Sequence, residues 1–414
     1  EVVFRWLCPI EKQSVTNALS ANSLRSAQIY FFAMCLFYIF AIIWLGITLV
    51  SCDKPGVPYP RGMMGEGDIE ALVLNEGKLN SNTGTISVIY KDGNVVADAF
   101  QDVNHRPMGD VAQSITLING KYFVAMNNSK KIEIVDPVTF KSVGTILYTQ
   151  AGYPRQVVSI SSTEAVVSDL NRQLVRIRTV APYGGPLEYI SIPRAVEYLT
   201  VVDNKVFGIT QGGLYVFDAD NIKKEQARVV KDIYNEEYTK TCQLLVDKEG
   251  MIWGLMNEQE GGQVTGITLK CVDPKREKVV KSYTLPFGDP NSQTPGEIIG
   301  YINYNRTDID PTGTWIYFSV KTRSAEENKE GVKEQQSVFR MNVETGEFSR
   351  YYDLQKVGMM YGFAVSPEGD IYLCDCLDYT AQRGYVRHYL KDGTKSSHKV
   401  GIYPGQVYFP ENQR

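Results

Sequence analysis

The sequence has few of the residues on which most hydrolases and metalloenzymes rely. Only three of its 414 residues are histidines (His105, His388 and His398). It contains no G-x-S-x-G, H-E-x-x-H or G-x-x-x-x-G-K-[ST] motif. Lys and Arg number 43 against 47 Asp and Glu, a formal net charge of −4 without a basic stripe, so the electrostatic signature of nucleic-acid binding is missing. The missing motifs exclude the familiar hydrolase, metalloprotease and phosphate-binding sites. They do not exclude a catalytic site assembled from distant segments.

Cysteines are also few and do not form a metal-binding pattern. Cys374-Asp375-Cys376 is a C-x-C, not the C-x-x-C of zinc and redox sites. Two of the seven cysteines, Cys8 and Cys35, lie in the N-terminal extension. We expect Cys242, Cys271, Cys374 and Cys376 to be free, buried thiols.

One long apolar run stands near the N-terminus. Residues 29–50 carry no charge, follow Lys12 and Arg25, and end at Leu49-Val50-Ser51-Cys52. This arrangement resembles a bacterial lipobox, so we predict a signal segment over residues 1–51 and lipidation of Cys52. The alternative is an uncleaved anchor helix. The Pro- and Gly-rich residues 52–68 are predicted to be a flexible tether.

A repeat fills residues 69–414. A short apolar strand followed by a polar tip recurs seven times, at residues 70–77, 121–128, 163–170, 204–211, 250–257, 313–320 and 369–376. A second strand, often ending in a turn such as Asp136-Pro137, and a third, more polar strand follow these copies, and an apolar run precedes all but the first. Each unit thus has four strands in about 40 to 60 residues, the size of a propeller blade.

The two ends of the repeat are complementary. The first unit lacks its first strand, and the chain ends in Gly401–Pro410, whose PGQVYF resembles the PRQVVS that begins at Pro154. We therefore predict an all-β, seven-bladed β-propeller with four antiparallel strands per blade, closed by a C-terminal strand at Pro404–Phe409. The charged insertion Thr322–Gln336 is predicted to be a solvated loop of blade six.

One face of such a propeller gathers the links between blades and the loops between second and third strands. These segments are rich in Asn, Asp, Arg, Gln, Tyr and Met, whereas the opposite face carries plain turns, so we predict ligand binding on the polar face. The alternative is that these residues only satisfy loop geometry. The candidate ligand-binding residues are Asn75, Asn80, Asn104, His105, Arg106, Asn127, Tyr153, Arg155, Asp169, Asn171, Arg172, Gln211, Asn257, Met360, Tyr361, Asp375 and Tyr379.

Two stretches carry a family resemblance. ALVLNEGKLNSNTGTISVIY (71–90) and RPMGDVAQSITLINGKYFVAMNNSKKIEIVDPVTFKSVGTI (106–146) resemble the YncE-like surface propellers of Bacteroidota, and the likeness extends over residues 70–180. That group includes BtuG-type lipoproteins, which capture cobalamin at the cell surface and pass it to a TonB-dependent outer-membrane transporter. The resemblance implies a lipid-anchored outer-membrane protein that binds cobalamin or another corrinoid as cargo, without a cofactor or catalysis.

Two other functions remain open at this stage. One is a propeller lyase or hydrolase with a central cation, in which His105 or Asp169 would be needed for turnover. The other is an adhesion or scaffold protein that contacts another protein through its loops. Fold alone does not decide among these alternatives.

Overall fold

The computed structural model describes residues 68–210, 212–223, 226–233, 242–260, 263–286, 294–301, 307–328, 331–354 and 357–410. The chain divides into two units, Glu1–Met63 and Met64–Arg414, and all of the described residues belong to the second unit. The predicted lipidation site Cys52 and the apolar run before it lie outside the described residues. Within the described ranges, no helix has the length and apolar character needed to cross a membrane.

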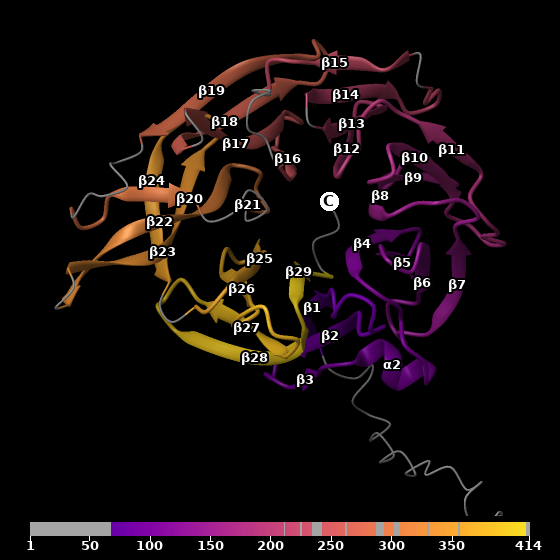
Figure 1. Cartoon of the computed structure of the whole chain (residues 1–414), viewed down its shortest axis with the longest axis horizontal. Coiled ribbons are helices and arrows are strands. Elements are labelled where there is room, and N and C mark those ends of the chain that lie inside the picture. Colours follow the sequence, from indigo (N-terminus) through magenta and orange to yellow (C-terminus); the bar gives the residue numbers. More distant parts are fainter. Residues whose placement is uncertain are drawn as a thin grey trace, which may run out of the picture. The chain divides into compact units, whose positions relative to one another are not determined.

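The described residues form seven antiparallel sheets arranged in a ring, which confirms the seven-bladed propeller (Figure 1). From the inside outward, blade one is β29 (Pro404–Tyr408), β1 (Ile69–Asn75), β2 (Thr85–Tyr90) and β3 (Val95–Val96). Blade two is β4 (Ala112–Ile118), β5 (Lys121–Met126), β6 (Lys131–Val135) and β7 (Ser142–Leu147). Blade three is β8 (Pro154–Ser159), β9 (Glu164–Asp169), β10 (Gln173–Arg178) and β11 (Glu188–Ser191).

The other four blades repeat this order. Blade four is β12 (Tyr198–Val202), β13 (Lys205–Thr210), β14 (Gly213–Asp218) and β15 (Arg228–Val230). Blade five is β16 (Leu244–Val246), β17 (Ile252–Glu260), β18 (Gln263–Asp273) and β19 (Lys278–Pro286). Blade six is β20 (Ile298–Tyr301), β22 (Trp315–Asn328), β23 (Gly331–Asn342) and β24 (Phe348–Leu354), with β21 (Thr307–Ile309) also paired to β22. Blade seven is β25 (Met360–Val365), β26 (Ile371–Asp375), β27 (Arg383–Tyr389) and β28 (Lys395–Ile402).

The ring is closed by the predicted exchange between the two ends of the repeat. β29 pairs antiparallel with β1, with Leu72 opposite Tyr408, Val73 opposite Val407 and Leu74 opposite Gln406. The last yellow strand therefore lies beside the first indigo strand in Figure 1. The predicted closing strand is confirmed and ends one residue earlier, at Tyr408.

The hydrophobic core lies between neighbouring blades. One buried cluster joins Leu72 and Ile86 of blade one to Ile115 and Val124 of blade two, and further clusters repeat this contact around the ring. A central strand is covered on both faces, so β5 reads as the nearly continuous apolar run KYFVAM. This burial explains why these strands were visible in the sequence as seven apolar copies.

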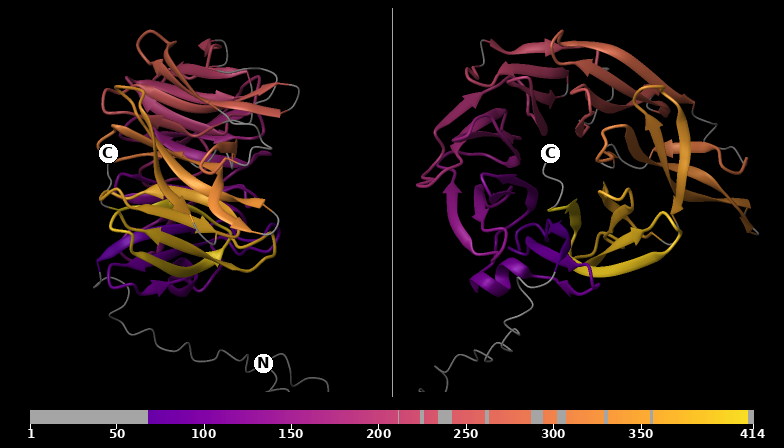
Figure 2. Two further views of the ribbon diagram at one scale, coloured as in Figure 1. Left: turned by 90° about the vertical axis from the view of Figure 1, so that its left-hand side faces the viewer. Right: turned by 180° about the vertical axis from the view of Figure 1, so that it is seen from behind.

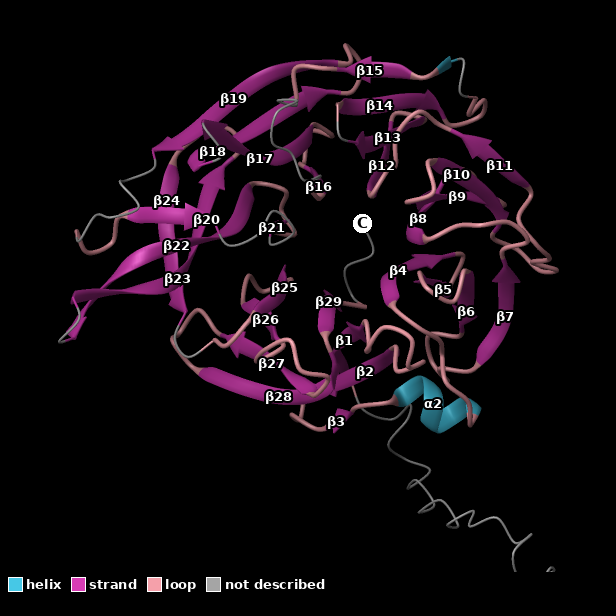
Figure 3. Cartoon of the chain, in the orientation of Figure 1, coloured by secondary structure: helices cyan, strands magenta, loops and turns pink. Residues whose placement is uncertain are grey.

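A short helix joins the first two blades. α2 (Ala99–Asn104) follows β3 at the outer edge of blade one and ends at His105, whose φ of 52° is left-handed (Figure 3). Phe100 buries its ring in the core between blades one and two. The helix therefore seals the outside of this junction.

Blade six differs from the prediction. The segment Thr322–Gln336 is not a loop but an extension of the β22–β23 hairpin, in which Lys321 pairs with Gln336, Arg323 with Glu334 and Asn328 with Gly331. Figure 2 shows this orange hairpin projecting beyond the ring. The loop prediction was wrong because it relied on polar composition, whereas backbone pairing continues whether or not a side chain is apolar.

The thiols behave as predicted. Cys242, Cys271, Cys374 and Cys376 are free and buried. Burial raises the pKa of the Cys242 thiol to about 12, so it remains protonated and unreactive.

Candidate ligand-binding site

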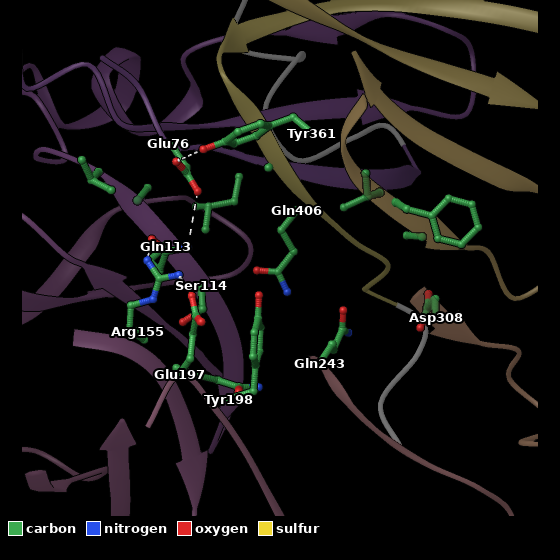
Figure 4. Close-up of a pocket in the computed structure, with 18 of the residues that line it drawn as sticks. Glu76, Gln113, Ser114, Arg155, Glu197, Tyr198, Gln243, Asp308, Tyr361 and Gln406 are labelled. Atoms are coloured by element: carbon green, nitrogen blue, oxygen red, sulfur yellow. Dashed lines mark hydrogen bonds and ion pairs between the residues drawn. The ribbon is translucent and has the colours of Figure 1, made fainter. Parts of the chain in front are cut away.

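A pocket of about 570 Å³ occupies the axis of the propeller (Figure 4). It lies at the end where the innermost strands begin, which is the face that collects the links between blades. Every blade contributes to its wall. The polar lining residues are Glu76, Gln113, Ser114, Arg155, Gln156, Glu197, Tyr198, Gln243, Asp308, Tyr361 and Gln406.

Five of these side chains form a continuous polar belt across five consecutive blades. Tyr361 Oη of blade seven donates to Glu76 Oε2 of blade one over 2.7 Å, and Gln113 Nε2 of blade two donates to Glu76 Oε1 over 3.4 Å. Arg155 of blade three then donates through Nη1 to Gln113 Oε1 and through Nη2 to Glu197 Oε1 of blade four. The polar belt fixes these side chains before any ligand arrives, which lowers the entropy cost of binding.

Burial sets the protonation of the belt at Glu76. Loss of solvent raises the pKa of the Glu76 carboxyl, and the hydrogen bond from Tyr361 partly opposes that rise. Burial, together with the neighbouring carboxyl, also raises the pKa of the Tyr361 phenol, so the phenol keeps its proton and donates it. Glu76 is thus a buried carboxyl in the pocket whose pKa lies above its usual value.

Two glutamines of the wall connect adjacent blades. Gln406 Oε1 accepts a hydrogen bond from the backbone N–H of Ile115 over 3.3 Å, and Gln156 Oε1 accepts one from Leu199 over 2.7 Å. Both glutamines follow a proline by two positions at the start of an innermost strand, in Pro404-Gly405-Gln406 and Pro154-Arg155-Gln156. The same sequence pattern therefore makes the same contact in blades one and three.

Of the candidate ligand-binding residues whose side chains are described, Arg155 and Tyr361 line this pocket. A second group is exposed in loops: Asn80, His105, Tyr153, Asn171, Arg172 and Tyr379. Tyr379 is 84% exposed. Met360 is buried in the core between blades six and seven.

Two buried aspartates fasten linkers to blades. Asp169 accepts hydrogen bonds from the backbone N–H groups of Tyr153 and Asn171. Asp375, at the equivalent position of blade seven, accepts them from Met359 and Leu377. Both aspartates lie at the end of the second strand of a blade. Each of them therefore holds in place the linker that precedes its blade.

Other candidates also contact the protein itself. The Asn75 side chain is fully buried and donates to backbone carbonyls and to Ser87 Oγ within blade one. Asn127 donates to Pro154 O across blades two and three. Asn104 Nδ2 donates to Phe100 O and Phe140 O, and Arg106 pairs with buried Glu133.

The side chains of three further predicted residues lie outside the described part of the structure. Gln211 and Cys52 lie outside the described residues, and Asn257 belongs to β17 but its side chain is not described. In the described part of the chain, no three His, Cys, Asp or Glu side chains are grouped to hold a metal ion.

Several wall residues were not among the candidates from the sequence: Glu76, Gln113, Ser114, Gln156, Glu197, Tyr198, Gln243, Asp308 and Gln406. Most of them sit near the start of innermost strands, and Glu76 directly follows β1, the second strand of blade one, whereas the prediction concentrated on loop tips. The shared Pro-x-Gln of residues 154–156 and 404–406 was a usable signal, because equivalent positions in successive blades face the same axis.

Comparison with known proteins assigns the family. Residues 70–298 match the family described as Domain of unknown function (DUF5074), and the chain belongs to that family. No curated protein matches the sequence.

Solved structures share the propeller fold. One from Bacteroides uniformis, provisionally assigned as a 6-phosphogluconolactonase, has a TM-score of 0.55 and 14% identity, over 83% of this chain and 99% of that one. A provisionally assigned 6-phosphogluconolactonase from Bacteroides fragilis gives 0.54 and 10%, over 83% and 98%. A Lactobacillus plantarum protein gives 0.55 and 11%, over 82% and 99%. At these identities the similarity extends to the fold alone.

Proposed function

We propose that this protein captures a polar ligand in its central pocket and does so without catalysis. The observation that carries the proposal is the polar belt, in which Tyr361, Glu76, Gln113, Arg155 and Glu197 hold one another in place across five blades. A pocket of about 570 Å³ is within the range of small-molecule sites. Fixed hydrogen-bonding groups around an enclosed axis favour tight binding of a ligand with many polar atoms.

Cobalamin or a related corrinoid is the ligand we propose. The resemblance of residues 70–180 to the YncE-like propellers supports this choice. So does the chemistry of the wall, because corrinoids carry peripheral amide side chains that both donate and accept hydrogen bonds. The macrocycle would lie over the mouth, near exposed side chains such as Tyr153, while amide arms enter the pocket.

The cellular setting is part of the same proposal. Lipidation of Cys52 would hold the protein at the outer membrane, exposed on the cell surface, and a TonB-dependent transporter would receive the ligand. The support is the Leu49-Val50-Ser51-Cys52 sequence after the apolar run. Replacing Cys52 by alanine should abolish palmitate labelling and release the protein from membranes. A Cys52→Ala protein that is still labelled and membrane-bound would overturn the anchoring.

Calorimetric titration of the purified full-length protein with cyanocobalamin tests the ligand. We expect saturable binding that weakens when Arg155 is replaced by alanine, since Arg155 joins Gln113 to Glu197 within the belt. Arg178, an exposed residue at the end of β10, provides the control Arg178→Ala. Absence of heat and of co-elution at micromolar cyanocobalamin would overturn the corrinoid assignment.

A second candidate is an enzyme, and Glu76 is the observation that favours it. A carboxyl with a raised pKa in a pocket is a common feature of general acids and bases. The test is lactone hydrolysis, using glucono-δ-lactone and 6-phosphogluconolactone, with Glu76→Gln as the variant. Turnover that disappears in this variant while the fold persists would favour the enzyme over the capture protein.

A further inference from the structure

Equivalent residues line the pocket in three consecutive blades: Gln406 of blade one, Ser114 of blade two and Gln156 of blade three. Each comes directly before the residue of the innermost strand that pairs with the same position of the second strand, two residues before that strand ends. A serine therefore stands in blade two where the blades on either side have a glutamine.

The two glutamines bridge the inner ends of their blade junctions. Gln406 Oε1 accepts the Ile115 N–H of blade two, and Gln156 Oε1 accepts the Leu199 N–H of blade four. Ile115 and Leu199 occupy the same register position in their own blades. The bridge is therefore a repeated contact, in which an amide oxygen meets the same backbone N–H of the next blade.

This bridge is missing between blades two and three. The equivalent backbone N–H belongs to Val157, and the Ser114 side chain is too short to reach it; Ser114 Oγ has no hydrogen bond in the described structure. The two strands nevertheless lie close together, since Thr116 Oγ1 donates to Val157 O over 2.9 Å. The gap thus results from the short side chain at position 114 and not from separation of the blades.

Unused donors surround this gap. Ser114 is 8% exposed, so its unpaired hydroxyl is buried. The Gln406 amide is held beside Ser114 by its bond to the next residue, Ile115, and its Nε2 has no acceptor in the described part of the chain. Arg155 Nε is also buried and unpaired. Buried donors of this kind are costly unless a ligand or water supplies an acceptor.

We infer that the gap at Ser114 is a subsite for a carbonyl oxygen of the ligand, and that Ser114 is the specificity-determining residue that admits it. The ligand oxygen takes the place that a glutamine amide oxygen occupies at the neighbouring junctions. It accepts hydrogen bonds from Ser114 Oγ and Gln406 Nε2. This inference rests on the proposed function, because it assigns a position to one polar group of the captured ligand.

Ser114→Gln tests the gap. The longer side chain should supply the missing bridge to Val157 N–H and fill the subsite. We therefore expect an unfolding temperature at least equal to that of the unmodified protein, together with roughly tenfold weaker binding of cyanocobalamin by calorimetry. Full affinity in a folded Ser114→Gln protein would overturn the inference.

Ser114→Ala tests the hydroxyl without filling the gap, and it decides the matter if the glutamine variant does not fold. Because Ser114 Oγ makes no hydrogen bond in the ligand-free protein, the unfolding temperature should not fall. We expect cyanocobalamin to bind about fivefold more weakly, since the ligand loses one donor. Unchanged affinity in this variant would contradict a contact with Ser114.

The control position is Ser162, in the exposed turn between β8 and β9. Ser162→Gln and Ser162→Ala make the same chemical changes and should bind cyanocobalamin as the unmodified protein does. If the unmodified protein binds cyanocobalamin and both Ser114 variants retain its affinity, the subsite is wrong and the capture function stands. Absence of binding to the unmodified protein would overturn both.

Discussion

Tyr361 and Glu76, which are 285 positions apart in the chain, share a hydrogen bond of 2.7 Å at the wall of the central pocket. The bond crosses the junction between blade seven and blade one. It therefore belongs both to the closure of the ring and to the candidate binding site.

Removing this hydrogen bond should change how binding depends on pH. Tyr361→Phe takes away the donor that opposes the burial-driven rise in the pKa of Glu76, so the Glu76 pKa should rise further. We expect the acid limb of the affinity profile to move to higher pH, with affinity at neutral pH reduced severalfold. Titrations between pH 5 and 8 measure this shift. Tyr183→Phe, in the core between blades two and three, is the control, and coincident profiles would contradict the role of the bond.

Arg155 should not be replaceable by lysine. Its two Nη atoms reach Gln113 and Glu197 in opposite directions, which a single ammonium cannot reproduce. We expect Arg155→Lys to bind cyanocobalamin about tenfold more weakly, with little change in unfolding temperature. Arg178→Lys serves as the control. Full affinity in Arg155→Lys would show that the charge alone suffices.

Asp375 should matter for stability. The buried carboxylate accepts backbone N–H groups and pairs with Arg387 Nε over 2.6 Å, so its removal leaves a partly buried guanidinium unpaired. Loss of one partner of a buried pair costs roughly 3–5 kcal/mol, and we expect Asp375→Ala to lose about that much. Urea unfolding measures the difference. Asp378→Ala, at an exposed carboxylate nearby, should lose far less, and equal losses would contradict the account.

The closing strand should be essential to the ring. Ending the chain before Pro404 removes β29, exposes the edge of β1 and uncovers the core between blades seven and one. We expect the truncated protein to aggregate or to unfold at a much lower temperature. The milder Val407→Ala change should cost about 1–3 kcal/mol and leave the protein soluble. A truncated protein with an unchanged melting temperature would refute the closure.

Acid should weaken the junction of blades one and seven through His388. Its ring stacks on Tyr372 and faces Glu70 on β1 and Asp370 beside β26, with His398 on β28 as the other nearby base. Burial lowers the His388 pKa despite these carboxylates, so the folded protein keeps the ring neutral. Below about pH 6.5 the unfolded chain therefore takes up a proton that the folded chain does not, and stability falls as the pH decreases.

The matching variant is His388→Gln. It should flatten the fall in stability between about pH 6.5 and 5, a range above the ordinary titration of carboxylates. His105→Asn, at an exposed histidine, should keep the full slope in the same unfolding measurements. An unchanged slope in His388→Gln would rule this histidine out.

The architecture could be predicted from the sequence because a strand buried on both faces leaves a recognisable apolar run. That signal recurs at residues 121–128 and 369–376, and the missing first strand at Glu70 was matched by Pro404–Phe409. The apolar signal was missing at Thr322–Gln336, because the two strands of this hairpin extension have no apolar face that would reveal them in the sequence.

The candidate site was harder to predict. Asp169 and Asp375 are polar residues at loop ends, as ligand contacts would be, but their carboxylates are occupied by backbone N–H groups. Residue type alone cannot separate these two uses. Glu76 and Glu197 belong to one polar belt only because strands from different blades converge on one axis. That convergence is a property of the closed ring and not of any single blade.

The pairing of β29 with β1 also constrains how the molecule is made. Since β29 follows every other strand in the chain, the edge of β1 has no partner until the ribosome has passed Tyr408. Blade one can therefore be completed only after the strands of the other six blades have been synthesised, through a contact between segments more than 300 residues apart. Such distant pairing forms slowly, so the pairing of β29 with β1 is expected to be a late and slow step in the formation of the propeller.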